Sequence, residues 1–218
     1  MICSAAASIE LKKQKINELN VFPVPDGDTG TNMSMTLGAA ATELRRKPDV
    51  TLTKAADVAA SALLRGARGN SGVILSLLFR GFSKALKGLE QADGRDFAAA
   101  LTTGVEAAYK AVMKPAEGTI LTVSRLTADA ARDLAAEDRS IESVLAAANP
   151  VAKAALDNTV NQNPVLKKAG VVDAGGMGFV VILEGMLSSL QGNDIVADES
   201  AAANIIQIDL PCRPCSLS

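Results

Sequence analysis

Apolar residues recur along most of this chain at the spacing of an amphipathic helix, and they predict an all-α fold. Met33, Leu37 and Leu44, for example, fall on one helical face. The apolar runs at 171–172 and 205–208 are too short to carry a sheet. Eight helices are expected: seven run from about 5 to 19, 33 to 46, 53 to 65, 94 to 113, 120 to 136, 140 to 161 and 179 to 190, and another begins after Gly72.

Four connecting loops are rich in glycine and polar residues, and they follow the first, third, fifth and seventh expected helices. In an up-and-down bundle with alternating helix direction, such alternate connections lie at the same end. We therefore expect the four loops to share one face of an antiparallel bundle. The bundle should span residues 1–192, with a tail over residues 193–218. The loops are residues 20–32, 66–72, 116–119 and 170–178.

The first loop carries two carboxylates one residue apart, Asp26 and Asp28. Prolines and glycines keep this segment out of a helix and force a tight turn, so both carboxylates can point at one place. A hard divalent cation with oxygen ligands is the usual partner of such a site. Thr31 or Asn32 should cap the next helix, whose N-terminus suits a phosphate. The alternative is that both aspartates serve only as turn and capping residues.

The second and third loops place glycines and hydroxyl residues before a helix, where backbone N–H groups can approach a ligand closely, and the fourth places glycines and Asp173 there. A plain helix–helix turn is the alternative for the second loop. The second loop lacks the Gly-Lys-Ser/Thr of a P-loop, and no strand precedes the fourth, as a dinucleotide fingerprint requires. An EF-hand is excluded at the first loop, because Leu37 falls where the last calcium ligand would have to stand. Glu117 either binds a metal or supports a metal ligand. The alternative is an acid in the first turn of a helix, where the helix dipole favours it.

Composition removes several classes of chemistry. The chain has no histidine, which excludes Ser-His and Cys-His nucleophiles and imidazole metal ligands. A formal net charge of -2, with both signs interspersed, argues against nucleic-acid binding. The body of the chain lacks cysteine, so disulfides do not hold the fold. Cys212 and Cys215 form a single C-x-x-C, which without a second pair is weak evidence for zinc or redox chemistry.

The remaining composition fits a globular cytoplasmic protein. No apolar run approaches the ~20 residues of a membrane span, and the N-terminus lacks the pattern of a signal peptide. With 218 residues, 48% of them apolar, the chain can bury a full core. Aromatic residues are only 3% and alanine is abundant, so closely packed helices should form that core.

Four ordered stretches resemble the nucleotide-binding domain of the dihydroxyacetone kinase family, and in particular the kinase domain of bacterial fatty acid kinases. The resemblance covers residues from about 15 to 192. It implies an eight-helix antiparallel barrel that binds ATP or ADP and two Mg²⁺ ions at one rim. It also implies an apolar interior that can trap a lipid. The matching stretches are Leu19–Met33, Gly66–Ile74, Lys114–Ile120 and the opening residues of Gly170–Gly178.

The same resemblance assigns roles to individual residues. Asp26 and Asp28 correspond to the metal ligands and the catalytic pair, and Asn20 lies near the place where dihydroxyacetone kinases carry a third aspartate. Compared with that third aspartate, Asn20 carries one negative charge fewer, and its spacing from the aspartate pair is longer by one residue. Nucleotide contacts map onto Thr29, Asn32, Ser71, Gly72, Thr119, Asp173, Gly175 and Gly176.

The activity implied is phosphoryl transfer from Mg·ATP to the carboxylate of a fatty acid, which a separate lipid-binding partner protein presents. A carboxylate is already ionised near neutral pH, so this acceptor needs no general base in a chain without histidine. One alternative is phosphorylation of dihydroxyacetone together with a dihydroxyacetone-binding subunit. Another is a nucleotide-binding regulatory module without catalysis. A homodimer, and the relation of this chain to the longer fatty acid kinases with further domains, stay open.

Overall fold

The computed structural model describes residues 1–196, and all regular structure in that range is helical. Every expected helix is present, and a short additional helix, α8, stands between the last two. The helices are α1 (Ile2–Glu18), α2 (Thr29–Arg45), α3 (Leu52–Gly66), α4 (Gly69–Ala85), α5 (Gly94–Ala111), α6 (Ile120–Leu134), α7 (Ile141–Gln162), α8 (Pro164–Ala169) and α9 (Ala174–Leu190).

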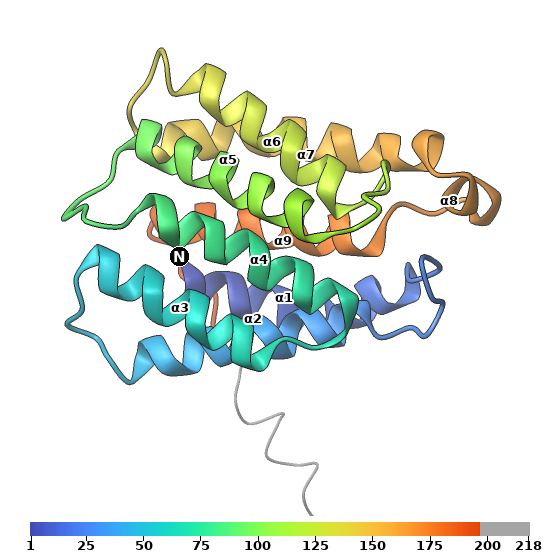
Figure 1. Ribbon diagram of the computed structural model, residues 1–218, viewed down its shortest axis with the longest axis horizontal. Coiled ribbons are helices and arrows are strands. Elements are labelled where there is room, and N and C mark those ends of the chain that lie inside the picture. Colours follow the sequence, from blue (N-terminus) through green and yellow to red (C-terminus); the bar gives the residue numbers. More distant parts are fainter. Residues whose placement is uncertain (197–218) are drawn as a thin grey trace, which may run out of the picture.

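The eight long helices lie alongside one another (Figure 1), and their contacts close them into an antiparallel ring. Each helix packs against the next in chain order from α1 to α7, α7 packs against α9, and α9 returns to α1. The expected eight-helix antiparallel barrel is therefore confirmed. Because α7 and α9 are consecutive in the ring, α8 and its flanking residues act as the connection between them.

Helix α8 was not predicted, and its local sequence explains it. The Asn163 side chain accepts a hydrogen bond from the Val165 N–H at 2.9 Å, which caps the helix, and Pro164 takes the first helical position, where its missing N–H has no cost. Gly170 ends α8 with a φ of 69°. A helix of six residues is too short to produce a readable period.

Small residues let the helices approach closely, as the composition suggested. Gly81 of α4 and Gly104 of α5 face each other: a Cβ on Gly81 would lie 2.6 Å from the Gly104 Cα, and a Cβ on Gly104 would lie 2.5 Å from the Leu78 carbonyl oxygen. The two helices therefore meet backbone to backbone. Helix α9 has consecutive buried residues from Phe179 to Leu183, so it is covered on all sides.

The interior of the ring is filled by side chains. A cavity of about 30 Å³ remains between α4, α5 and α9, with Phe79, Phe179 and Met186 among its apolar lining. It has room for about one water molecule. The expectation that an acyl chain is trapped in this interior is therefore not met at this cavity.

Two sequence expectations concern the chain outside this core. Within residues 1–196, none of the helices combines the length and the hydropathy that a membrane span requires. Cys212 and Cys215 lie outside the described residues, as does most of the tail expected from residue 193.

Candidate functional site

The four loops singled out by the sequence lie together at one end of the barrel, on the right in Figure 1. They surround a cavity of about 490 Å³, to which each loop contributes side chains. Cofactor sites in proteins commonly have this size. The expectation that the four loops share one end of the bundle, drawn from the alternate connections, is therefore confirmed.

Most of the predicted site residues line this cavity, and three stand behind its wall. The Asn32 amide packs against the Gly69 backbone, Gly72 packs against Thr36, and Gly176 packs against the buried side chains of α6 and α7. These three support the wall. The predicted residues that line the cavity are Asn20, Asp26, Asp28, Thr29, Ser71, Thr119, Asp173 and Gly175.

The first loop is held at both ends by asparagine side chains. The buried Asn20 donates from Nδ2 to Oδ1 of the exposed Asp26 at 2.6 Å. Near the end of α1, the Asn17 side chain donates to the Thr31 hydroxyl at 2.9 Å and accepts from the Thr31 N–H at 3.1 Å. Asn20 thus orients the Asp26 carboxylate, while Asn17 fixes the start of α2.

Helix α2 begins earlier than expected. The prediction that Thr31 or Asn32 caps it is wrong: Asp28 is the N-cap residue, and Thr31 is already helical and bound to Asn17. The Asp28 side chain makes no capping hydrogen bond. Its carboxylate lines the cavity instead. Side-chain capping, the alternative role considered for this aspartate, is therefore absent.

Asp26 and Asp28 make a small, open set of oxygen donors. Within residues 1–196, no three acidic or cysteine side chains gather as a ready-made metal cage. Mg²⁺ does not need one, because it commonly takes one or two carboxylates and completes its shell with water and substrate phosphates. The donor set at this rim therefore fits magnesium bound together with a nucleotide.

The start of α4 forms part of the cavity wall. Gly69, Asn70 and Ser71 line the cavity there. The N-cap residue, Arg68, makes no side-chain capping bond, and the first turn of α4 has no acidic residue. Helix N-termini of this kind attract phosphate through backbone N–H groups and the helix dipole.

Asp173 occupies the place where the N-termini of α6 and α9 meet. Its carboxylate accepts from the Gly176 N–H at 2.7 Å and also from the Ile120 N–H, while its own N–H donates to the Thr159 hydroxyl at 3.0 Å. The residue is only 4% exposed. Burial raises the pKa of Asp173 to about 6, against the lowering effect of the two backbone hydrogen bonds.

We expect Asp173→Asn to flatten the dependence of stability on pH. Because the folded-state pKa is raised, the folded chain retains this proton better than the unfolded chain, and wild-type stability falls as pH rises from about 3.8 to about 6. The loss by neutral pH is about 3 kcal/mol. Asparagine keeps a capping oxygen but does not titrate. Urea unfolding of both proteins from pH 4 to 7.5 measures the difference, and parallel curves would contradict the assignment.

Sequence analysis missed the apolar wall and one cation. Ile74, Leu77, Val112 and Leu121 line the cavity. Helical periodicity places Ile74 and Leu77 on a covered face, but it does not tell whether a helix or a ligand covers that face. Lys114 supplies the positive charge among the described residues that line this cavity. The sequence signal that could have identified Lys114 is its position directly before Pro115 and the Gly-Thr loop.

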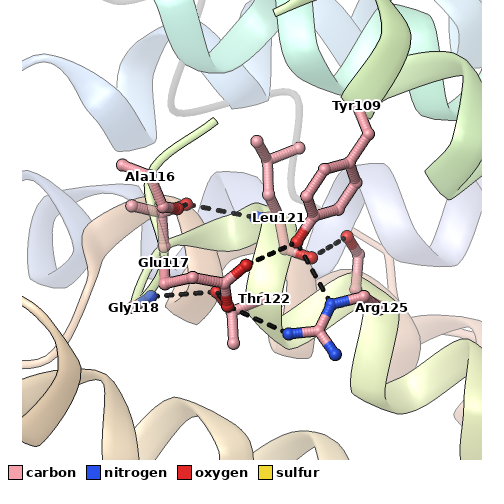
Figure 2. Close-up of polar contacts among 9 residues, drawn as sticks. Tyr109, Ala116, Glu117, Gly118, Leu121, Thr122 and Arg125 are labelled. Atoms are coloured by element: carbon pink, nitrogen blue, oxygen red, sulfur yellow. Dashed lines mark hydrogen bonds and ion pairs between the residues drawn. The ribbon is translucent and has the colours of Figure 1, made fainter. Parts of the chain in front are cut away.

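Glu117 lies in the third loop, yet it is not part of the cavity lining. Figure 2 shows its carboxylate among Tyr109, Thr122 and Arg125. The prediction that Glu117 is an acid in the first turn of a helix is wrong, because α6 begins only at Ile120. A role as direct metal ligand gains no support from this placement.

Known proteins similar to this chain match it over most of its length. Residues 23–188 match the DAK2 domain. Protein YloV of Bacillus subtilis is 46% identical over 195 residues, which are 89% of this chain and 35% of that protein. An uncharacterised protein of Staphylococcus saprophyticus is 45% identical over 197 residues, 90% of this chain and 36% of that protein. This chain thus spans about a third of the length of these relatives.

A solved structure has the same fold. The native crystal structure of the dihydroxyacetone kinase of C. freundii superposes with a TM-score of 0.63, at 21% sequence identity, over 86% of this chain and 33% of that chain. At this identity the similarity concerns the fold.

Proposed function

Because this chain belongs to the DAK2 domain family, we propose that it is the ATP-binding domain of a kinase that phosphorylates the carboxylate of a fatty acid presented by a lipid-binding partner protein. The observation that carries this proposal is the cavity at the rim. It joins two carboxylates, an uncapped helix N-terminus and an apolar wall in one space of nucleotide size.

Each part of the cavity suits one part of Mg·ATP. Asp26 and Asp28 would hold the magnesium, with Asn20 keeping Asp26 in place. Thr29 and the start of α4 at Ser71 would take the phosphates. Bound magnesium supplies neutralisation of phosphate charge. We assign the adenine to the apolar wall, and the ribose to the side of Thr119 and Gly175.

The proposed chemistry needs little from the protein beyond positioning. An oxygen of the ionised acceptor carboxylate forms a bond to the γ-phosphorus as the bond to the leaving ADP oxygen breaks, which gives acyl phosphate and ADP. No proton has to be removed from the acceptor. Lys114 lines the cavity and would reduce the repulsion between the two anions that must approach each other. We place this reaction in the cytoplasm, where ATP is available.

The direct test combines this chain, Mg·ATP and a lipid-binding protein loaded with fatty acid. Acyl phosphate should form and be trapped by hydroxylamine as hydroxamate. The Asp28→Asn variant, which keeps the size of the side chain but loses its charge, should form none. Dependence of the signal on both the partner and the fatty acid would support the proposal.

The same cavity serves the other functions considered. Turnover only with a dihydroxyacetone-binding subunit, which must then supply the base that this histidine-free chain lacks, would reassign the acceptor. Binding of Mg·ATP without turnover with either partner would indicate a regulatory module. These outcomes differ from each other and from the hydroxamate result.

A further inference from the structure

We propose that Glu117 is a positioning residue that holds the third loop, and with it the N-terminus of α6, against the nucleotide cavity. The inference rests on the proposed function, because its effect is on nucleotide binding. It assigns a role to a side chain that lies outside the cavity and that would not contact the ligand.

The Glu117 carboxylate ties together the two helices that flank the loop. Its Oε1 accepts from the Tyr109 hydroxyl at 3.3 Å, and its Oε2 accepts from the Thr122 hydroxyl at 2.8 Å and from Arg125 at 2.9 Å (Figure 2). Arg125 also donates from Nε to the Tyr109 oxygen at 3.3 Å. Tyr109 belongs to the last turn of α5, and the other two partners belong to α6.

The network reaches the cavity through Thr122. This fully buried hydroxyl donates to Glu117 and accepts from the Gly118 N–H at 2.9 Å. Gly118 has a φ of 72°, and a Cβ there would lie 2.9 to 3.0 Å from atoms of Thr159 and of residues 162–163, so its backbone has little freedom. The next residue, Thr119, caps α6 and lines the cavity.

The network is charged across the physiological pH range. Partial burial raises the pKa of Glu117, but the hydrogen bonds from Thr122, Arg125 and Tyr109 and the charge of Arg125 outweigh it, so the pKa lies below its ordinary value. The Glu117 side chain is 53% exposed, and exposed ion pairs contribute little to global stability. Variants at this position should therefore fold.

Glu184 of α9 offers a matched control. It receives two charged partners, Lys12 at 2.9 Å and Lys153 at 2.8 Å, where Glu117 has one charged and two hydroxyl partners, and it ties together α1, α7 and α9. It does not line the nucleotide cavity. Loss of either glutamate removes a comparable set of surface interactions, but only Glu117 connects to the cavity wall.

The test is calorimetric binding of Mg·ATP to the full chain and to both variants. We expect Glu117→Ala to weaken binding by roughly 10- to 100-fold, by analogy with the loss of groups that orient the ligands of a metal. Glu184→Ala should bind as wild type does. Thr122→Val should reproduce the loss, and Thr122→Ser, which keeps the hydroxyl, should restore binding. Amide exchange at Gly118 should speed up in Glu117→Ala.

The outcomes separate this inference from the proposed function. If wild type binds Mg·ATP and Glu117→Ala binds it equally well, the positioning role is wrong and the function stands. If Glu184→Ala loses as much affinity as Glu117→Ala, the effect is general destabilisation and the inference is also overturned. If wild type binds no nucleotide at all, the proposed function is wrong and the inference is wrong with it.

Discussion

Replacing Asp28 with alanine is expected to abolish Mg²⁺-dependent ATP binding while leaving the fold intact. Loss of a capping side chain would cost about 1 kcal/mol, but the Asp28 side chain makes no capping bond, so α2 should lose less than that. The site, in contrast, loses one of the two carboxylates on its first loop. Isothermal calorimetry with and without Mg²⁺, together with a thermal unfolding curve, measures both effects.

Asp49→Ala provides the control for this substitution. Asp49 is an exposed aspartate in the loop between α2 and α3, at the end of the barrel opposite the cavity. Its variant should bind Mg·ATP normally. Unchanged affinity in Asp28→Ala would remove this aspartate from the metal site, and a collapse of stability would show a structural role instead.

Gly81→Val is expected to have the largest effect on stability, a loss of about 3 kcal/mol or more. Overpacking of a well-packed interior typically costs 1–3 kcal/mol, and at this position the new atoms meet backbone, which cannot rotate away. A Cβ on Gly81 would already lie 2.6 Å from the Gly104 Cα. Valine adds two methyl groups to that Cβ. Urea unfolding followed by circular dichroism measures the change.

Gly38→Ala is the matched control, because Gly38 is also a helical glycine but has nothing within 4 Å of its Cβ position. Here alanine should stabilise the protein by up to about 1 kcal/mol through helix propensity. If Gly81→Val leaves the unfolding midpoint unchanged, α4 and α5 are not packed as closely as described.

The antiparallel helical bundle could be predicted from sequence because most of its helices are long and show an apolar period and because the loop chemistry alternates, whereas its closure into a barrel was implied by the family resemblance. The predictions that failed, the absence of α8 and the start of α2, depend on single side-chain contacts. Helix α8 depends on one asparagine cap and one proline. The early start of α2 depends on Asn17, which binds Thr31 from the preceding helix. A cap formed by a residue on another helix has no signature in the local sequence.

Much of the polar half of the cavity could be predicted, and the rest could not. Asp26 and Asp28 stand in a loop that its glycines and prolines mark out, and glycines flank Ser71, which lies in the first turn of α4. Leu77 reads as an ordinary core residue, because a ligand wall and a helix interface require the same side chains. Two partners of Glu117, Tyr109 and Arg125, stand eight positions away on either side, and they meet only when α5 and α6 pack.

The Asp173 carboxylate makes the electrostatic potential differ between the two sides of the cavity. Above a pH of about 6 its carboxylate is ionised and cancels the positive ends of α6 and α9, whereas the first turn of α4 has no such acid. A polyphosphate that entered toward α9 would meet a buried negative charge, and one that entered toward α4 would meet uncapped N–H groups. For the nucleotide binding proposed above, the Asp173 charge therefore favours the orientation in which the phosphates lie toward α4 and away from α9.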